Sequence, residues 1–324
     1  MKKTLTISIA TYNVESYLQE LLDRLLTSKR LDLLDILVID DGGTDRSLEI
    51  AKSFSEKFPS VVRAFHKENG GWGSTVTAGI KLAHGKYFRL LDGDDLYDVD
   101  ALDKFVDFLN DCETDAVLSP YLKFFEDSDV IEKPRNPLFE IEAPKRINVE
   151  EIPVAPFTLE TYSLTFRTDL LQDANVEITE RCFYTDNEYV AKSVNLCETF
   201  SVVPYRVYQY RLGRAGQSVS AEGMKKHYKE FEFILKKMLS YTRDCIKNEK
   251  LKEIFYKRYG ALSYYYFETL LKMGAERQYV DSCKQFDIWL KEEFNFIYSQ
   301  IRYVPIMILR KTGYRFYTLA RLFR

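Results

Sequence analysis

Two apolar runs near the start of the chain each end in a cluster of aspartates. Residues 36–39 lead into Asp40–Asp45, which reads Asp-Asp-Gly-Gly-Thr-Asp, and residues 87–91 lead into Asp92–Asp95, which reads Asp-Gly-Asp-Asp. If both runs are parallel strands, the clusters share one edge of the sheet, where their carboxylates repel one another. Carboxylates one residue apart suit a hard divalent cation, Mg²⁺ or Mn²⁺, that keeps positions for phosphate oxygens. Either cluster alone would indicate only a turn, but the two together favour a ligand site.

The elements that must position these aspartates alternate between strand-like and helical patterns. Short apolar runs predict strands at 5–10, 36–39, 61–65, 87–91 and 116–118. Apolar residues three and four apart predict helices at 17–26, 48–58, 74–83 and 101–109. This alternation predicts βαβ units and therefore an α/β fold, with a mostly parallel sheet flanked by helices.

The pattern changes twice further along the chain. Residues 121–158 contain or adjoin six of the nine prolines, and we interpret them as irregular, hairpin-like connections. Strand-like runs return at 162–166 and 200–203, and from about residue 221 the apolar residues keep a helical period. We therefore expect an α/β domain over residues 1–220 and a helical C-terminal region over residues 221–324.

Composition and charge exclude several functions. The 324-residue chain has a net charge of −3 and a pI near 5.9, which argues against a nucleic-acid binder. It has no apolar run of about 18 residues, and its first residues lack the apolar core and cleavage site of a signal peptide. Five scattered cysteines without metal-ligand spacing indicate reduced thiols, so we expect a cytoplasmic protein.

Four motifs, taken in this order, resemble the family 2 glycosyltransferases, which have the GT-A fold. The motifs are Thr11–Asn13, Val38–Asp45, Asn69–Gly71 and Leu91–Asp95. The resemblance covers about the first 110 residues strongly and reaches about residue 220 more weakly. It implies an enzyme that transfers a sugar from a nucleotide diphosphate donor to an acceptor hydroxyl, with inversion at the anomeric centre.

The resemblance also implies which residues bind the nucleotide. Asp41 would accept a hydrogen bond from the base, usually from N3–H of uracil, beside the backbone of Ala10 and Thr11. Asp40 would shape that turn. Further candidates near the base are Lys67 and Asn69.

The same resemblance implies a metal site at the second cluster. Asp94 would hold the Mg²⁺ or Mn²⁺ that bridges the two phosphates, while Asp92 would reach the ribose or a metal-bound water. Asp95 would contact the donor sugar or hold the loop. Trp72 would stack on a ring or simply pack in its loop.

An inverting transfer also needs a general base on the acceptor hydroxyl. In the segment 184–189, Asp186 occupies the position of the family's aspartate, although Thr185 replaces the usual Glu. Glu188 is the alternative base. Thr185 or Asp186 would otherwise cap a helix, and a capping carboxylate at the rim of a pocket can still act as a base.

A Tyr-Arg segment with nearby glycines follows at residues 210–218. In the family such a segment lies on a flexible loop near the diphosphate, so Arg211 and Arg214 would close over the product phosphates. A solvated loop is the alternative.

The last residues are basic and rich in aromatic side chains. Residues 294–324 carry six Lys or Arg and no acid, interleaved with aromatic and aliphatic residues. Such a segment suits peripheral binding to an anionic surface, here the inner face of the cell membrane. A packed helix with a solvated basic face and a homodimer interface are the alternatives.

We therefore expect an inverting, metal-dependent glycosyltransferase with a UDP-sugar donor and a glycan or lipid-linked acceptor, in polysaccharide, teichoic-acid or glycolipid assembly. A sugar-phosphate nucleotidyltransferase would need a Gly-rich basic signature where residues 11–15 stand, and a dehydrogenase would need G-x-G-x-x-G there. The non-enzymatic alternative is a degenerate sugar-nucleotide binding module. The Asp92/Asp94 pair and Asp186 favour an enzyme.

Overall fold

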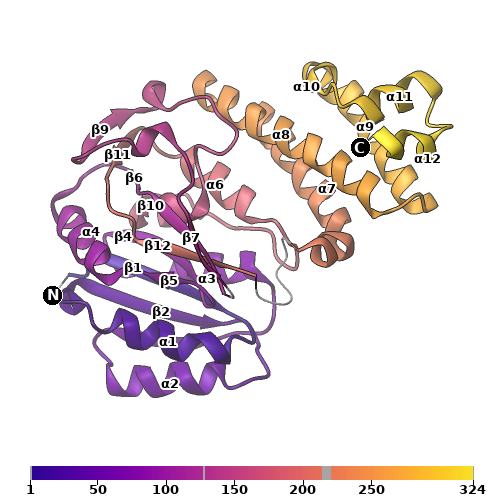
Figure 1. Cartoon of the computed structure of the whole chain (residues 1–324). Helices are drawn as coiled ribbons and strands as arrows, with labels where there is room; N and C mark the ends of the chain where they lie inside the picture. The colour runs from indigo at the N-terminus through magenta and orange to yellow at the C-terminus, as the bar shows by residue number, and fades with distance from the viewer. Residues whose placement is uncertain (1, 127, 214–219, 324) are drawn as a thin grey trace. The chain divides into compact units, whose positions relative to one another are not determined.

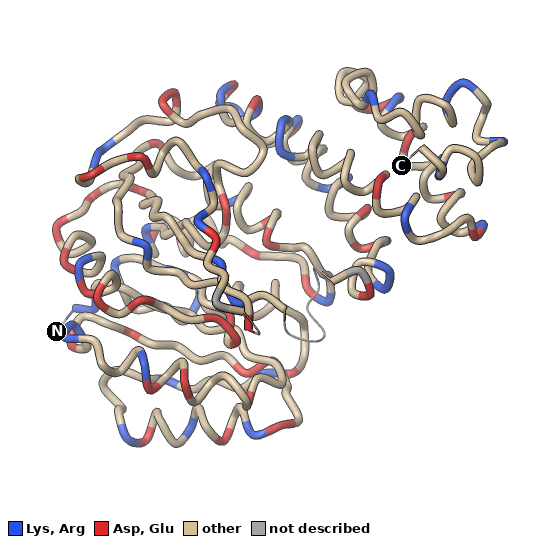
Figure 2. The backbone as a smooth tube through the Cα atoms, in the orientation of Figure 1, with Lys and Arg blue, Asp and Glu red and all other residues tan. Residues whose placement is uncertain are grey.

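The computed structural model describes residues 2–126, 128–213 and 220–323 (Figure 1). The chain divides into two compact units, one of residues 1–153 with 158–215 and one of residues 154–157 with 216–324. Lys and Arg are interspersed with Asp and Glu along both units (Figure 2).

The larger sheet of the first unit has eight strands within the described residues. Their spatial order is β3 (Val62–His66), β2 (Leu34–Asp40), β1 (Leu5–Thr11), β4 (Tyr87–Asp92), β10 (Leu164–Arg167), β6 (Ala116–Leu118), β11 (Thr199–Val202) and β9 (Lys145–Asn148). The first four are mutually parallel, whereas β10 and β9 run antiparallel to their neighbours. The predicted α/β class with a mostly parallel sheet is confirmed.

A second, smaller sheet takes two of its strands from residues 121–158, where we expected irregular connections. It contains, in order, β5 (Leu96–Tyr97), β12 (Tyr208–Leu212), β7 (Tyr121–Phe125) and β8 (Ser128–Glu132). The hairpin of β7 and β8 agrees with the expected hairpin-like character, but the parallel pairing of β7 with β12 joins segments distant in sequence. Sequence periodicity carries no signal for such a long-range pairing.

Strand β2 begins two residues earlier than predicted, because a charged residue is buried in it. Asp35 is 4% exposed and accepts two hydrogen bonds from Arg63 and one from Thr6. Burial alone would raise the pKa of Asp35, but these hydrogen bonds outweigh it and lower the pKa. The ion pair lets a carboxylate occupy a strand position that the apolar pattern excludes.

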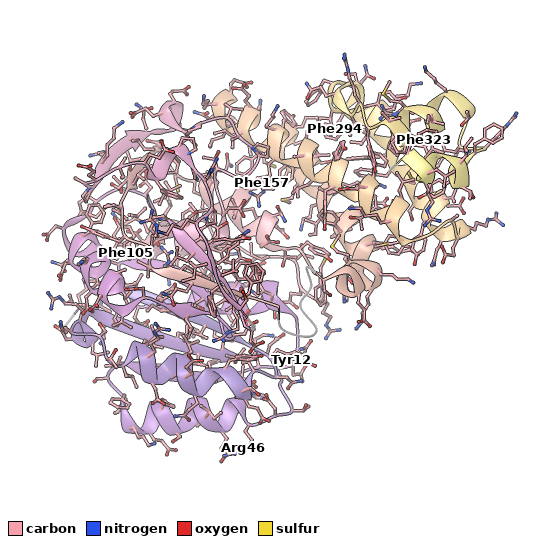
Figure 3. The ribbon with its side chains drawn as sticks, viewed as in Figure 1. Tyr12, Arg46, Phe105, Phe157, Phe294 and Phe323 are labelled. Atoms are coloured by element: carbon pink, nitrogen blue, oxygen red, sulfur yellow. The ribbon has the colours of Figure 1, made fainter. Side chains whose placement is uncertain are left out.

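Helices cover both faces of the larger sheet. The first unit contains α1 (Glu15–Leu25), α2 (Ser47–Lys57), α3 (Trp72–Leu82), α4 (Val99–Asp111), α5 (Thr168–Asp173) and α6 (Asp186–Val194). Apolar residues of α1, α2 and α4 share one core cluster with Leu5, Ile7 and Ile9 of β1. Residue Phe105 of α4, labelled in Figure 3, is fully buried in it. On the other face Gly79 of α3 lies directly against Ser8.

The second unit is helical, as predicted for the C-terminal region. It contains α7 (Ala221–Asp244), α8 (Glu249–Met273), α9 (Arg277–Glu293), α10 (Asn295–Gln300), α11 (Val304–Thr312) and α12 (Tyr317–Ala320). Side-chain oxygens of Ser220 and Asn248 cap α7 and α8 by accepting from backbone N–H groups. The core of this unit is aromatic, with Phe286 against Tyr266 and Phe267.

The start of α3 is in close contact with the segment that leads to α6. A Cβ atom added at Gly73 would collide with the carbonyl oxygen of Thr179 and lie 3.0 Å from Ile178 Cγ2. The backbone N–H of Arg181 also donates to Gly70 O over 2.6 Å. The segment 178–181 therefore rests on the first turn of α3.

We predict that Gly73→Ala lowers the free energy of unfolding by about 1–3 kcal/mol, because the new methyl group overpacks this contact. Gly260→Ala is the control, since its Cβ would meet nothing nearer than Ile297 Cγ2 at 3.9 Å. In α8 that change should stabilise by about 1 kcal/mol, as alanine is the better helix former. Denaturant unfolding measures both, and similar effects from the two variants would contradict the prediction.

Candidate active site

Parallel pairing aligns the ends of β1, β2 and β4 at one edge of the larger sheet. Thr11 of β1 lies opposite Asp40 of β2, and Ala10 lies opposite Asp92 of β4. The alignment continues past the strands, because Asp41 N donates to Thr11 O over 2.9 Å and Gly93 N to Ala10 O over 3.0 Å. Both aspartate clusters therefore start at the same edge.

The carboxylate of Asp41 is buried and surrounded by donors. Oδ1 accepts from Lys67 Nζ at 2.6 Å, Gly70 N at 3.0 Å and Ser74 Oγ at 3.3 Å. Oδ2 accepts from Gly71 N at 2.8 Å. Gly71 can present this N–H because its φ of +80° is open to glycine. One cation and three further donors offset the cost of burying the charge.

The carboxylate of Asp40 is held by a different set of groups. His66 Nδ1 lies 2.7 Å from Oδ2, and Gly43 N donates to Oδ1 over 3.3 Å. The hydroxyl of Thr11 donates to Ile39 O over 2.9 Å. Asp40 and Thr11 therefore brace the turn that carries Asp41.

The residues predicted to surround the base are gathered around this turn: Ala10, Thr11, Asp40, Asp41, Lys67 and Asn69. Asn69 is exposed, and its amide donates to Asp41 O over 2.9 Å.

At the second cluster, Trp72 connects the metal motif to the helix of the expected base. Its Nε1–H donates to Asp92 Oδ1 over 2.8 Å. Its ring meets that of Tyr189 edge-on, with centroids 6.3 Å apart. Tyr189 is three residues after Asp186 in α6, so the two lie on the same side of that helix. Trp72 therefore makes contacts within the protein, and its stacking on a ring of a ligand stays a prediction.

Asp95 lies beneath the metal motif and is 1% exposed. Tyr208 donates its hydroxyl to Oδ2 over 2.6 Å and accepts from Asp92 N at 3.3 Å, and Arg211 N donates to Oδ1 over 2.7 Å. Burial, together with the charges of Asp92 and Asp94, raises the pKa of Asp95 well above its usual value. Of its two expected roles, Asp95 takes that of holding the loop.

A hydrogen bond, an ion pair and two aromatic rings hold the side chain of Arg211. Its Nε donates to Asp94 O over 2.7 Å, and its guanidinium lies 3.2 Å from a Glu20 oxygen. The rings of Tyr17 and Phe124 lie about 5 Å from its centre, at 5.0 and 4.9 Å. Arg211 therefore holds in place the loop that carries Asp94. Arg214 lies outside the described residues.

Asp186 is the first residue of α6 and is half-buried, with Oδ1 accepting from Asn187 Nδ2 at 3.1 Å. The preceding Thr185 makes no capping hydrogen bond with its side chain. Glu188 is fully buried, paired with Lys192 at 2.8 Å and accepting from Thr179 N at 3.1 Å. Of the two carboxylates, Asp186 is the one that solvent reaches.

A preformed metal cage is absent from the described part of the chain. No three His, Cys, Asp or Glu side chains among residues 2–126, 128–213 and 220–323 gather to hold an ion. Yet Asp92 and Asp94 each lie close enough to Asp95 to raise its pKa. One or two carboxylates plus substrate phosphates form a typical Mg²⁺ site, so these residues fit an ion that arrives with a diphosphate.

Sequence reasoning missed three side chains of this site. Ser74, His66 and Tyr208 contact Asp41, Asp40 and Asp95, respectively. Ser74 follows the Gly70-Gly71 pair by three residues, and His66 ends β3 beside the Asp40 strand end, so their positions carried a weak signal. Tyr208 carried none, because its contact depends on the pairing of β12 with β5.

Curated relatives of the chain include one protein of teichoic acid synthesis. The minor teichoic acid biosynthesis protein GgaB of Bacillus subtilis (strain 168) is 25% identical over 276 residues, which cover 84% of this chain and 30% of GgaB. The chain spans less than half the length of the first three curated relatives that it matches, at 30%, 35% and 45%.

Solved structures share the fold over nearly the whole chain. Residues 1–349 of S. aureus TarS in complex with UDP-GlcNAc give a TM-score of 0.68 at 18% identity, covering 99% of this chain and 90% of that one. The mannosyltransferase PcManGT from Pyrobaculum calidifontis, in complex with GDP-Man and Mn²⁺, gives 0.59 at 14% identity, covering 100% and 85%. These likenesses show the GT-A fold.

The family itself follows from the sequence of the first unit. A profile of glycosyl transferase family 2 matches residues 6–172, just over half of the chain, and includes both aspartate clusters. This match decides against the nucleotidyltransferase alternative. The chain belongs to glycosyl transferase family 2.

Proposed function

We propose that this protein transfers a sugar from a UDP-sugar to an acceptor hydroxyl with inversion, using Mg²⁺ or Mn²⁺. The observation that carries the proposal is the alignment of Thr11, Asp40 and Asp92 at one sheet edge. In this proposal the buried carboxylate of Asp41 binds the nucleobase. The nearby carboxylates of Asp92 and Asp94 bind the metal ion together with the diphosphate. We further propose that residues 1–220 form the catalytic domain.

The preference for uracil follows from the hydrogen bonds already made by Asp41. Oδ1 accepts from Lys67, Gly70 and Ser74, whereas among the described residues Oδ2 accepts from Gly71 alone. One oxygen therefore remains for a single further donor. Uracil offers one, its N3–H, whereas guanine presents two adjacent donors that would need both oxygens.

Asp94, with Asp92, would hold the metal ion together with the donor's phosphates. When bound, the ion stabilises the charge that develops on the leaving diphosphate. Arg211 holds the loop of Asp94 in place through the Asp94 carbonyl. Contact of Arg214 with the product phosphates stays a prediction.

Asp186 would act as the general base. The acceptor oxygen bonds to C1 of the sugar and its proton passes to Asp186, while the bond from C1 to the β-phosphate oxygen breaks and UDP leaves with that electron pair. Support comes from the position of Asp186 at the accessible start of α6, one turn from Tyr189 and its contact with Trp72.

The setting we propose is teichoic-acid or related surface-polymer synthesis, at the inner face of the membrane. Its support is the similarity to GgaB and the basic segment 294–324. No helix of the described residues is long and apolar enough to cross a membrane. Within the segment, Arg310 pairs with Asp287 at 2.7 Å, whereas Arg302, Lys311 and Arg315 are exposed. Large apolar side chains beside them are also exposed: Val304, Met307, Phe316, Leu319, Leu322 and Phe323.

The donor and the metal can be tested through tryptophan emission. The chain has two tryptophans, so Trp289→Phe leaves Trp72 as the only reporter, hydrogen-bonded to Asp92. We predict that Mn²⁺ quenches its emission strongly only when UDP is present, because the ion is held jointly by carboxylate and diphosphate. GDP should act at much higher concentration, and Asp94→Ala should remove the UDP-dependent quenching.

The matched control is Trp72→Phe, which leaves Trp289 packed on Phe286 in the second unit. The emission of Trp289 should not change when Mn²⁺ and UDP are added. Equal quenching of Trp289, or equal potency of GDP, would contradict the donor assignment. Steady hydrolysis of a UDP-sugar with Mn²⁺ separates an enzyme from a degenerate binding module.

The base is tested by Asp186→Asn. Transfer should fall by about 10²–10⁴-fold, the usual contribution of a positioned base, with UDP affinity and melting temperature unchanged. Glu188→Gln is the control: it breaks a buried ion pair, so it should lower the melting temperature. If Asp186→Asn transfers sugar at the wild-type rate, the assignment is wrong.

Membrane binding is tested by charge reversal, because truncation would remove the buried Ile306, Leu309 and Tyr317. Lys311→Glu/Arg315→Glu should weaken binding to phosphatidylglycerol vesicles at least about tenfold, since each basic group near such a surface contributes about 1 kcal/mol. The control is Lys225→Glu/Lys226→Glu on α7, where both lysines are also exposed. This variant should bind the vesicles as wild type does. Equal losses, or a wild type that ignores the vesicles at low salt, would refute a surface-binding tail.

A further inference from the structure

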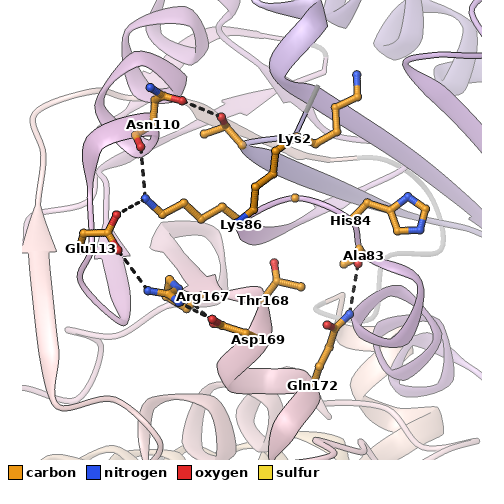
Figure 4. Close-up of a pocket in the computed structure, with 13 residues that line it drawn as sticks. Lys2, Ala83, His84, Lys86, Asn110, Glu113, Arg167, Thr168, Asp169 and Gln172 are labelled. Carbon is orange, nitrogen blue, oxygen red and sulfur yellow. Dashed lines mark hydrogen bonds and ion pairs between the residues drawn. The ribbon is translucent and has the colours of Figure 1, made fainter.

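A pocket of about 430 Å³ opens at the edge of the larger sheet opposite the active site (Figure 4). Lys3, Lys86 and their neighbours line it where β1 and β4 begin. Arg167 and Thr168 line it at the end of β10. Strand β4 runs from Tyr87 beside the pocket to Asp92 in the active site. Six residues at about 3.3 Å each separate the two by roughly 20 Å, so this pocket is not part of the donor site.

The pocket is basic in an acidic chain. Its lining carries Lys2, Lys3, Lys86 and Arg167 against Glu113 and Asp169, a net charge of +2 with His84 neutral, whereas the whole chain carries −3. Burial lowers the pKa of Lys3, although the carboxylates of Asp35 and Asp32 act to raise it. A bound anion would favour the charged form of each of these lysines.

The carboxylates that meet Lys86 and Arg167 are exposed. Lys86 Nζ lies 2.6 Å from Glu113, whose side chain is 72% exposed. Arg167 pairs with Asp169, which is 56% exposed, and lies 3.5 Å from Glu113. The side chains of Lys86 and Arg167 are themselves only 18% and 26% exposed, but their partners reach solvent, which screens each pair, so an anionic ligand can compete with Glu113 and Asp169 for the two cations.

A buried hydroxyl at the base of the pocket lacks a partner. Thr168 is 5% exposed, and its Oγ1 makes no hydrogen bond within the described residues. Figure 4 shows Thr168 beside Arg167, Asp169 and Gln172, and its Oγ1 has less than 1 Å² of accessible surface. The backbone of Thr168 is fixed, since its N–H donates to Lys86 O over 3.0 Å. A buried hydroxyl without a partner is costly, and a ligand oxygen would satisfy it once the side chains that cover it turn aside.

We propose that this pocket binds a phosphate group, as the free ion or as a phosphate ester. A phosphate has the charge for Lys86 and Arg167, and its oxygens accept from the Thr168 hydroxyl. Of the lining residues that the structure describes, none is Phe, Tyr or Trp. The imidazole of His84 is therefore the one aromatic ring among these lining residues, so the pocket offers little surface on which a nucleobase would stack.

The decisive variant is Thr168→Val, which keeps the shape of the side chain and removes only the hydroxyl. Inorganic phosphate is titrated calorimetrically at low ionic strength with EDTA, so that no metal ion can hold phosphate at the acidic edge. We expect Thr168→Val to weaken phosphate binding roughly fivefold, with a melting temperature equal to or above that of wild type. Lys86→Met should weaken it roughly tenfold or more.

Lys145→Met is the matched control, because Lys145 makes an exposed pair with Glu151 at 2.8 Å on another strand. It should bind phosphate as wild type does. Glycerol 3-phosphate and a bis(glycerol) phosphodiester are titrated as well, to find which kind of molecule supplies the phosphate group. Tighter binding of the diester indicates a polymer chain. Tighter binding of inorganic phosphate or of the monoester indicates a small metabolite. Absence of binding by all three probes, or a Thr168→Val variant that melts lower yet binds unchanged, overturns the proposal.

Discussion

The crowding of carboxylates at one sheet edge is the constraint on which the first unit depends. Strands β2 and β4 both pair in parallel with β1 and end in Asp40 and Asp92, and Asp41, Asp94 and Asp95 follow directly, so these charges lie at one edge. The protein compensates them differently: a lysine and backbone amides for Asp41, an imidazole for Asp40, an indole for Asp92, and a raised pKa for Asp95. Excess negative charge remains where a cation and a diphosphate would bind together.

These compensating groups also join parts of the site that sequence keeps apart. Trp72 touches both Asp92 and the helix of Asp186, while Asp95 joins the metal loop to β12 through Tyr208 and Arg211. These contacts are short hydrogen bonds and one edge-on contact between the rings of Trp72 and Tyr189, so a shift of one element must move its neighbour. The site is thus preorganised by hydrogen-bond donors of the protein itself.

The sequence predicted the alternating elements of the first unit because helical and strand periods are local properties. It also predicted the shared edge, because parallel strands end together. It did not predict the pairing of β7 with β12, nor therefore Tyr208 above Asp95, since these need contacts across more than 80 residues. It misjudged the start of β2, where Arg63 neutralises Asp35. Polar residues whose partners lie elsewhere in the fold are the ones that local patterns misread.

The contact of Gly73 with Thr179 makes two segments of the first unit depend on each other. The segments 69–73 and 178–181 fit together with no room for a side chain at Gly73. Replacing one of these segments alone by another sequence would bring together surfaces that do not fit. A chimeric protein would therefore have to exchange both segments together.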